Sequence, residues 1–572
     1  MANPFVEDIA ARVGAAAGLA PAEVAQTLTT PPNPKMGDYC FPCFNAAKAQ
    51  RCKPNEVAQE LAARLAEGGY AGTVQVVGPY LNFLINRKDF SAWVLREVHQ
   101  RKERYGHTNA FKGRKLVVDY SSPNICKHLS IYHVRNTMVG YALCQLHRAQ
   151  GWTVVGINHL GDWGTQFGLL IAGFKRWGDE NIFLGDAVEK LQDLYVKANE
   201  EAKKDEAFAA EGRAWFLKLE QGDPEALALW KRFRDASLAA FYEVYDTLGV
   251  KFEVIGGESL AREQMPRTIE RAKAMGLATM SEGALIVDLS DMKMPPLMLL
   301  KSDGGTRYET RDLATAELRY EQHKFDKMIY VTGQDQKLYF RQLFETLRRM
   351  GYAWAERLRH VAHGMTRIAG ERMRTRTGGA VKLRDVLAEA VERELEIVVA
   401  REAEAKTPAE AKAQAEHSRM VAIGSIIFHD LKREVTKDID FDWDEALRWE
   451  GDTGAYVQYA HARICSILRK YGKPVSADVD AGLLSAEEEY LLIRKVSEFE
   501  AEIGRAVDRL EPSMICRYLL DLCALLSDFY GKHKVLCEDE RLSAARVALM
   551  EAVRQTIANG LALLGVGAPE EM

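Results

Sequence analysis

The sequence predicts a multidomain α/β protein with a central parallel sheet. Three observations predict this class: a strand–turn–helix–strand stretch at 115–168, a small mixed α+β segment before residue 105, and a helical pattern from residue 384 onward. With 572 residues, 47% of them hydrophobic, the chain is long enough for about two to four hydrophobic cores. We therefore expect three domains, at 1–105, 106–383 and 384–572.

The stretch Lys115–Gly168 contains the first strand, turn and helix of the predicted sheet. Leu116–Val118 is an apolar run that the Ser-Ser-Pro-Asn at 121–124 interrupts, and Thr153–Ile157 is the next apolar run. Between them, apolar residues recur at helical spacing: Ile131, Val134, Met138 and Ala142. Such a βαβ unit places the N-terminus of its helix at the carboxyl edge of the sheet, where phosphate groups bind well. A nucleotide-using enzyme is the first hypothesis.

The same stretch resembles the first signature region of the class I arginyl-tRNA synthetases. The positions that match the family are Ser122, Pro123, Asn124, Lys127, His133, Arg135, Thr137 and the run Asn158–Gly168. The family tetrapeptide His-x-Gly-His reads Ser130-Ile131-Tyr132-His133 here, so a Ser replaces the first His and a Tyr replaces the Gly. The resemblance covers essentially the whole chain and implies a class I Rossmann-like catalytic domain, with a helical insertion at about 175–250.

The resemblance also implies an ATP site. Lys127 and His133 are expected to act on the phosphates, together with Arg374 and Arg376 from a Gly-bounded basic loop at 370–379 that resembles the second class I signature. In the family, the loop lacks one lysine, and a lysine just before the first signature is thought to compensate for it. Lys127 occupies that position in this sequence. Tyr132 is expected to stack on adenine. The full set of expected ATP-binding residues is Ser130, Tyr132, His133, Gly161, Asp162, Gly164, Thr165 and Met365.

An arginine pocket is implied by three further clusters that match the family in chain order, at 256–259, 301–305 and 308–314. Tyr308 and Asp312 are four residues apart on a predicted helix, so their side chains share a face. A carboxylate there can bind a guanidinium through two parallel hydrogen bonds. The residues expected to surround L-arginine are Asn124, Glu258, Tyr308, Asp312 and Gln336.

The two flanking domains are expected to bind tRNA. Residues 72–86 alternate like two short strands around Gly78-Pro79, and the segment resembles the amino-terminal domain of the family, which touches the tRNA elbow. The run 451–464 matches the helical anticodon-binding domain, where aromatic rings can stack on loop bases while Arg binds phosphate. The expected tRNA-binding residues are Asn82, Tyr456, Gln458 and Arg463, and one of Tyr456 and Tyr459 is expected to be bundle core.

In the last domain, long amphipathic helices are predicted at Val386–Ala405, His417–Lys432, Glu488–Leu510, Ser513–Lys532 and Leu542–Leu564.

Composition limits the alternatives. The net charge of −5 argues against nucleic acid unless basic residues cluster, and they do so at 367–376 and 463–473. The sequence has neither a Gly-x-Gly-x-x-Gly dinucleotide motif nor a P-loop, which argues against a dehydrogenase or P-loop enzyme. The nine scattered cysteines favour buried free thiols, so no protein metal site is expected. No membrane-spanning run or signal segment is recognised, so we expect a cytoplasmic protein with no membrane partner.

The predicted function is ATP-dependent ligation of L-arginine to tRNA(Arg) through arginyl-adenylate, with Mg²⁺ held mainly by the oxygens of ATP. Two alternatives stay open at this point. One is a paralogue that binds tRNA or arginine but does not activate arginine, because Tyr132 occupies the position of a Gly against which adenine packs. The other is an ATP-dependent ligase that joins arginine to an acceptor other than tRNA.

Overall fold

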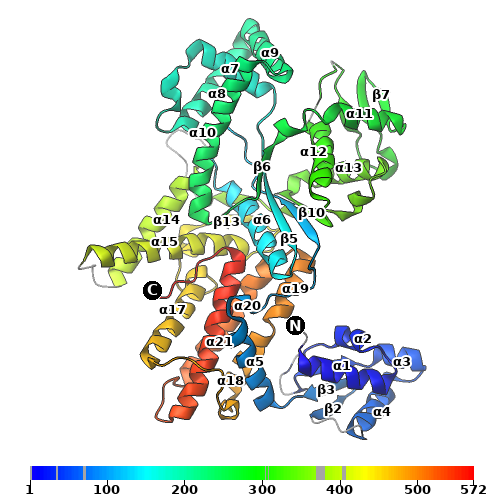
Figure 1. Cartoon of the computed structure of the whole chain (residues 1–572), viewed down its shortest axis with the longest axis vertical. Coiled ribbons are helices and arrows are strands. Elements are labelled where there is room, and N and C mark those ends of the chain that lie inside the picture. Colours follow the sequence, from blue (N-terminus) through cyan, green and yellow to red (C-terminus); the bar gives the residue numbers. More distant parts are fainter. Residues whose placement is uncertain are drawn as a thin grey trace. The chain divides into compact units, whose positions relative to one another are not determined.

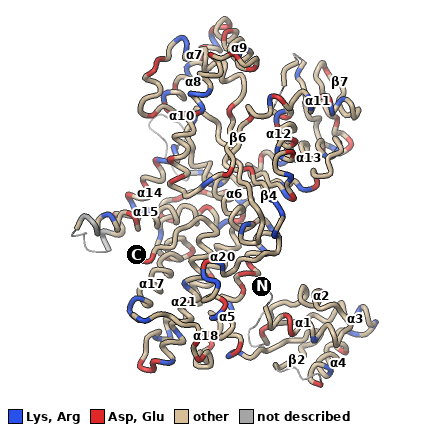
Figure 2. Tube along the Cα trace, viewed as in Figure 1, with Lys and Arg blue, Asp and Glu red and all other residues tan. Residues whose placement is uncertain are grey.

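The computed structural model of the chain describes residues 3–31, 33, 36–67, 72–302, 304–306, 308–368, 381–401 and 407–572 (Figure 1). The chain divides into two compact units, each assembled from separate stretches of sequence. The first contains Met1–Lys102, Tyr471–Ser497 and Leu525–Val553, and the second contains Glu103–Lys470, Glu498–Ala524 and Arg554–Met572. Lys and Arg are interspersed with Asp and Glu along the trace of both units (Figure 2).

The amino-terminal part of the first unit is a three-stranded antiparallel sheet with helices. The strands pair in the order β1-β3-β2, and the hairpin predicted around Gly78-Pro79 is formed by β2 and β3. Strand β1 is additional to the hairpin predicted from the sequence. The elements are α1 (Pro4–Ala17), α2 (Pro21–Thr27), β1 (Tyr39–Pro42), α3 (Phe44–Gln50), α4 (Pro54–Glu67), β2 (Thr73–Val77), β3 (Tyr80–Leu84) and α5 (Arg87–Arg101).

Local chemistry explains where α1 and α5 begin. The side chain of Asn3 accepts hydrogen bonds from the backbone N–H groups of Phe5 and Val6, and Asn86 does the same for the first turn of α5. Later in the chain, α18 (Glu487–Ser497) joins this unit. The hydroxyl of Tyr490 on α18 donates to Asp38, and Asp38 also accepts from the backbone N–H of Ile85. Residues more than 400 positions apart therefore share one core.

The second unit is built on a five-stranded parallel sheet. Its strand order is β11-β10-β4-β5-β6, so the first strand in sequence, β4, lies in the centre. The chain runs from β4 outward to β6 and then returns to β10 and β11 on the other side. The switch point between β4 and β10 is where open α/β sheets bind ligands. The strands are β4 (Lys115–Asp119), β5 (Thr153–Leu160), β6 (Val254–Gly257), β10 (Lys327–Gly333) and β11 (Leu358–His363).

Both faces of this sheet are buried, which explains the continuous apolar runs in its strands. Helix α6 (Tyr132–Ala149) packs against β4, β5 and β10 and buries Val134, Met138 and Ala142, as the helical spacing predicts. The opposite face packs on a hydrophobic core that includes α12 (Tyr308–His323), α13 (Lys337–Arg349) and a small antiparallel sheet. That sheet and its preceding helix are α11 (Met265–Ala274), β7 (Ala278–Ser281), β8 (Ala284–Val287) and β9 (Leu297–Leu300).

Four helices connect β5 to β6, in agreement with the predicted helical tract. Three of them begin with an Asp whose side chain accepts from backbone N–H groups: Asp186, Asp205 and Asp223. Such N-caps explain why the charge-rich sequence divides into separate helices at these points. The helices are α7 (Thr165–Trp177), α8 (Ala187–Lys204), α9 (Glu206–Gln221) and α10 (Pro224–Leu248).

The last third of the chain is helical apart from the short strand β13 (Ile439–Phe441), which pairs with β12 (Thr366–Ile368). The single helix predicted at Glu488–Leu510 is wrong: α18 ends at Ser497 and α19 (Phe499–Arg509) begins after Glu498. The backbone of Glu498 stays near helical angles (φ −78°, ψ −11°), so the hydrophobic period continues through the break. The other helices are α14 (Leu383–Arg401), α15 (Pro408–Leu431), α16 (Trp443–Ala446), α17 (Gly454–Tyr471), α20 (Ser513–Lys532) and α21 (Glu540–Leu564).

No helix within the described ranges is both long enough and apolar enough to cross a membrane. All nine cysteines are free, and seven of them are buried; Cys52 is exposed and Cys537 is partly exposed.

Candidate active site at the carboxyl edge of the sheet

Each strand of the five-stranded sheet leads into residues that the sequence predicts to bind substrate. All five strands are parallel, so these residues follow the same edge of the sheet. Asn124 and Lys127 follow β4, Gly161 follows β5, Glu258 follows β6, Gln336 follows β10 and Met365 follows β11.

The turn after β4 has an unusual backbone. Ser121, Ser122 and Cys126 have φ values of 70°, 47° and 61°, which non-glycine residues rarely adopt. The backbone N–H of Ser122 donates to the side chain of Asn158, and that of Cys126 donates to the hydroxyl of Ser237 on α10. Each strained residue costs about 1–3 kcal/mol, which these contacts must offset. The turn that contains Asn124 is therefore held in one conformation by neighbouring elements.

His133 is oriented by Ser130, which lies just before α6. The Nδ1 atom of His133 lies 3.0 Å from the backbone N of Ser130, 3.0 Å from its Oγ and 3.3 Å from its carbonyl oxygen. Burial lowers the pKa of His133, so the neutral ring is favoured. Because the N–H contact is shorter than the contact to the carbonyl, we assign Nδ1 as acceptor, which leaves the proton on Nε2.

This geometry changes the expected role of Ser130. Its side chain is buried and lies against His133, so it orients the histidine and is not aimed at a nucleotide. Tyr132 is the first residue of α6, and 48% of it is exposed. Lys127, Thr165 and Met365 are also exposed, so all four side chains are open to a ligand.

Gly161 leaves room for Asn124. A Cβ atom at Gly161 would lie 1.9 Å from the side-chain oxygen of Asn124. The backbone N–H of Gly161 donates to the carbonyl of Pro123, and its carbonyl accepts from the N–H of Ile125. Gly164, which precedes α7, has φ 143°, a value that favours glycine. Both glycines thus set the backbone geometry around the turn at 121–126, which is called the signature turn below.

Asp162 is a correction to the predicted ATP site. Its side chain is completely buried, and it accepts from both the backbone N–H and the hydroxyl of Ser259 at 3.0 and 2.9 Å. Gly257 leaves room for this carboxylate, because a Cβ there would lie 2.3 Å from it. Asp162 therefore holds the turn that contains Glu258, and its burial does not support a direct contact with ATP.

Tyr308 and Asp312 lie in the first two turns of α12, the helix that the sequence predicts for them. The carboxylate of Asp312 accepts from the hydroxyl of Tyr339 on α13, and the rings of Tyr308 and Tyr339 meet edge to face with centroids 5.2 Å apart. Burial raises the pKa of Asp312 to about 6, although the Tyr339 hydroxyl opposes this shift. Tyr339 is not among the residues predicted from the sequence.

Glu258 lies beside the same helix. The guanidinium of Arg311 forms an ion pair with it, with Nε 3.0 Å from Oε2. The pKa of Glu258 is raised to about 7, mainly by burial; Arg311 opposes this shift, and the nearby carboxylates of Asp312 and Asp162 contribute to it. The pocket therefore contains more negative charge than the chain's own cations offset, which suits a cationic ligand.

A buried ion pair connects this pocket to the signature turn. Arg319 on α12 lies 2.7 Å from the carboxylate of Asp119 at the end of β4, and both side chains are largely buried. Asp119 also accepts from the hydroxyl of Ser122. Helix α12, which carries Tyr308 and Asp312, and the turn after β4 are thus fixed to each other by a hydrogen-bonded charge pair.

Two of the residues expected to bind tRNA are buried. Asn82 on β3 is 1% exposed. Gln458 on α17 is 0% exposed, and its amide donates to the carbonyls of Met420 and Gly567. Neither position supports a direct contact with tRNA, and we revise the role of Gln458 to a structural one.

The other two residues expected to bind tRNA lie on α17. Tyr456 is partly buried, and its hydroxyl donates to the carbonyl of Cys523. Tyr459 is 41% exposed, and Arg463 is exposed one turn further along the helix. Of the two tyrosines, Tyr456 is therefore the one that packs within the bundle, as expected for one of them.

Arg374 and Arg376, which are expected to act on the phosphates, lie outside the described residues. Arg311 is not among the residues predicted from the sequence. Its position next to Asp312, in a cluster that matches the family, is the one signal that could have identified it. Ser259 likewise stands next to Glu258. No sequence pattern connects Tyr339 to Asp312, because they are 27 positions apart on different helices.

Comparisons with known proteins agree with this arrangement. Residues 95–443 match the family model described as "tRNA synthetases class I (R), catalytic domain". Residues 457–572 match the "DALR anticodon binding domain", and residues 5–85 match the "Arginyl tRNA synthetase N terminal domain".

Similar whole proteins carry the same description. An arginine–tRNA ligase of Clostridioides difficile is 42% identical over 550 residues, and one of Clostridium perfringens is 40% identical over 551 residues; each match covers 96% of both chains. The arginyl-tRNA synthetase structure of Thermus thermophilus superposes with a TM-score of 0.81 at 26% identity, covering 100% of both chains. The chain therefore belongs to the arginyl-tRNA synthetases, the class I enzymes that use ATP to ligate arginine to tRNA(Arg).

Proposed function

We propose that the carboxyl edge of the sheet binds arginine and ATP next to each other and that the protein acts mainly by positioning them. The observation that carries this proposal is the pair of carboxylates, Glu258 and Asp312. Helix α12, which carries Asp312, is fixed to the turn after β4 through the ion pair of Arg319 with Asp119. Positioning of two bound reactants can account for a large part of a rate enhancement.

In the proposed complex, the guanidinium of arginine lies against Asp312 and Glu258, with Tyr308 beside it. Two carboxylates can form the bidentate, charge-assisted hydrogen bonds that distinguish arginine from lysine. Asn124 and Gln336 are both exposed at the ends of β4 and β10, which suits contacts with the amino-acid end of the substrate. That end must approach the α-phosphate of ATP.

For ATP, we propose that His133 donates from Nε2 to a phosphate oxygen and that Lys127 adds positive charge nearby. Tyr132 stacks on adenine, Gly161, Gly164 and Thr165 form the backbone wall, and Met365 packs against the nucleotide. The arginine carboxylate attacks the α-phosphate in line, giving arginyl-adenylate and pyrophosphate. The terminal adenosine hydroxyl of tRNA then attacks the carbonyl carbon of the adenylate and takes the arginyl group, and AMP leaves. Arg374 and Arg376 are proposed to neutralise charge on the departing pyrophosphate.

Mg²⁺ is proposed to accompany ATP and to be held by its phosphate oxygens. Within the described ranges, one group of His and carboxylate side chains has ligand atoms close enough for a metal ion: His128, Asp186 and Glu189. Its carboxylates already pair with Lys382 and Arg384, so this group does not fit a dedicated Mg²⁺ site.

For tRNA, we propose that the domains at 1–105 and 384–572 both contact the substrate and that the domain at 106–383 is the catalytic one. Tyr459 and Arg463 are exposed on α17, so we retain Arg463 as a contact and propose Tyr459 in place of Tyr456 and Gln458. Stacking on loop bases with a phosphate contact is a common mode of recognising single-stranded RNA.

The experiment that tests the arginine site compares Asp312→Asn with Glu321→Gln, a matched change on an exposed part of α12. Asp312→Asn should weaken arginine binding by about 3–5 kcal/mol, because a buried charge partner is lost. It should also reduce charging of tRNA(Arg) with labelled arginine. Glu321→Gln should leave both unchanged. Equal arginine affinity in Asp312→Asn and wild type would refute the proposed pocket.

A further inference from the structure

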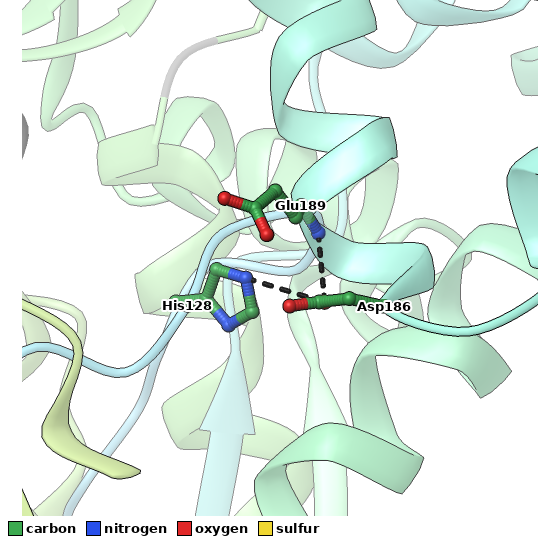
Figure 3. Close-up of side chains that lie close together, drawn as sticks. All are labelled: His128, Asp186 and Glu189. Carbon is green, nitrogen blue, oxygen red and sulfur yellow. Dashed lines mark hydrogen bonds and ion pairs between the residues drawn. The ribbon is translucent and has the colours of Figure 1, made fainter. Parts of the chain in front are cut away.

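A strip of polar and aromatic residues on α8 faces the segment before α6. The strip consists of Asp186, which caps α8, and Glu189, Gln192 and Tyr195 at successive three-residue steps. Figure 3 shows the ring of His128 facing Asp186, with Glu189 one turn further along the helix. This strip belongs to the helical tract between β5 and β6, and no residue in it is among those predicted to act in catalysis.

The far end of the strip contacts Lys127 directly. The Nζ atom of Lys127 lies 5.4 Å from the centroid of the Tyr195 ring, within the range of a cation–π interaction. The next residue is held as well, because the backbone N–H of His128 donates to the side-chain oxygen of Gln192 at 3.4 Å. Both the ammonium group and the adjacent backbone are therefore restrained by α8.

The near end of the strip anchors α8 to a second segment, Val381–Arg384. Lys382 lies 2.8 Å from Glu189, and Arg384 lies 2.6 Å from Asp186. The same segment pairs by backbone with the residues before α6: the N–H of Leu383 donates to the carbonyl of Leu129 at 2.8 Å. Helix α8 is thus fixed in place by charge pairs and cannot shift without breaking them.

The His128, Asp186 and Glu189 group is better explained as part of this anchor than as a metal site. Its ligand atoms lie within 4.8 Å of one another, but both carboxylates already have cationic partners. His128 lies 3.4 Å from Asp186, and burial lowers its pKa, with Lys382 and Arg384 lowering it further. A metal ion would have to displace two cations to bind there.

We infer that α8 positions Lys127 for catalysis, with the ring of Tyr195 as the positioning residue. The inference rests on the proposed role of Lys127 at the phosphates of ATP. A lysine side chain has four rotatable bonds and loses much of its conformational freedom when fixed. An aromatic face that restrains the ammonium before ATP binds reduces that loss, and Tyr195 provides such a face without neutralising the charge.

The test uses Tyr195→Phe and Tyr195→Leu, with Tyr242→Leu on α10 as a control for the same substitution at an exposed tyrosine away from Lys127; Tyr195 itself is partly buried. Tyr195→Phe keeps the aromatic face and should retain wild-type rates. Tyr195→Leu should lower kcat by about threefold to tenfold in arginine-dependent ATP–pyrophosphate exchange measured with tRNA present, the range expected for one cation–π contact. The KM for arginine and the activity of Tyr242→Leu should not change.

A double-mutant cycle with Lys127→Met separates positioning from a general structural effect. In the Lys127→Met background, Tyr195→Leu should cause no further loss of kcat. An equal loss in both backgrounds, or wild-type kcat in Tyr195→Leu while Lys127→Met is impaired, would overturn this inference alone. Wild-type kcat in Lys127→Met would refute the proposed role of Lys127 and the inference with it.

Discussion

Arginine binding should depend steeply on pH between pH 8 and pH 6. Burial raises the pKa of Glu258 to about 7 and that of Asp312 to about 6, from ordinary values of 4.5 and 3.8. The guanidinium binds the ionised carboxylates, so it lowers both pKa values and releases protons when it binds. A raised pKa in the free protein means that the carboxylate is protonated below that pH. Affinity must therefore fall as the pH falls through 7 and then 6.

The size of the effect follows from the two pKa values. If both carboxylates must be ionised, the apparent Kd at pH 6 is about 20-fold higher than at pH 8, which corresponds to about 1.8 kcal/mol. With ordinary pKa values the same change in pH would alter the Kd by less than about 1.1-fold. Since the carboxylate of Asp312 raises the pKa of Glu258, the profile belongs to the pair and not to either residue alone.

Isothermal titration calorimetry with arginine at pH 6, 7 and 8 measures this profile. Repeating the titration at pH 6.5 in two buffers of different ionisation enthalpy counts the protons released, and about one is expected. Glu258→Gln should reduce the change in Kd between pH 8 and pH 6 to about twofold, because only Asp312 still titrates. Glu321→Gln serves as the control and should reproduce the wild-type profile. A Kd that is constant from pH 8 to pH 6, with no proton release, would refute the reasoning.

Three further substitutions test other parts of the chain. Tyr132→Phe should bind ATP as the wild type does, whereas Tyr132→Ala should lose about 1–3 kcal/mol of ATP-binding free energy, the usual value of base stacking. Tighter ATP binding in both Tyr132→Ala and Tyr132→Gly would exclude stacking. Arg463→Ala should reduce the slope of log affinity for tRNA against log salt by about one phosphate contact, and an unchanged slope would make Arg463 a structural residue. Arg135→Met should lower the free energy of unfolding by about 3–5 kcal/mol in urea titrations, because Asp430 would be left buried without its partner; a loss below about 1 kcal/mol would contradict this.

Features fixed by neighbouring residues were predictable from the sequence. The βαβ unit at 115–168, the hairpin around Gly78-Pro79 and the helix that begins at Tyr308 all depend on short-range periodicity and turn residues. The family assignment also rests on short motifs, and the match to the class I arginyl catalytic domain confirms it. The break at Glu498 was not predictable, because its backbone stays close to helical and the apolar period is not interrupted.

Side-chain partners far apart in the sequence were not predictable. Lys127 and Tyr195 are on different elements, as are Asp119 and Arg319, and no spacing rule connects them. Motif matching also cannot separate residues that touch a ligand from those that hold the site together. Asp162 lies in a run that matches the family, yet its carboxylate is completely buried against Ser259.

The altered tetrapeptide keeps the backbone contact that sets the tautomer of His133. The contact that makes Nδ1 of His133 an acceptor comes from the backbone N–H of residue 130, at 3.0 Å. Any residue at that position except proline supplies this N–H, so the replacement of the family's His by Ser leaves the tautomer unchanged. The Ser130 hydroxyl, also 3.0 Å from Nδ1, further restrains the ring. His133 therefore keeps Nε2 available to donate to a phosphate oxygen, and the substitution at Tyr132 is the part of the variant signature whose effect depends on how adenine binds.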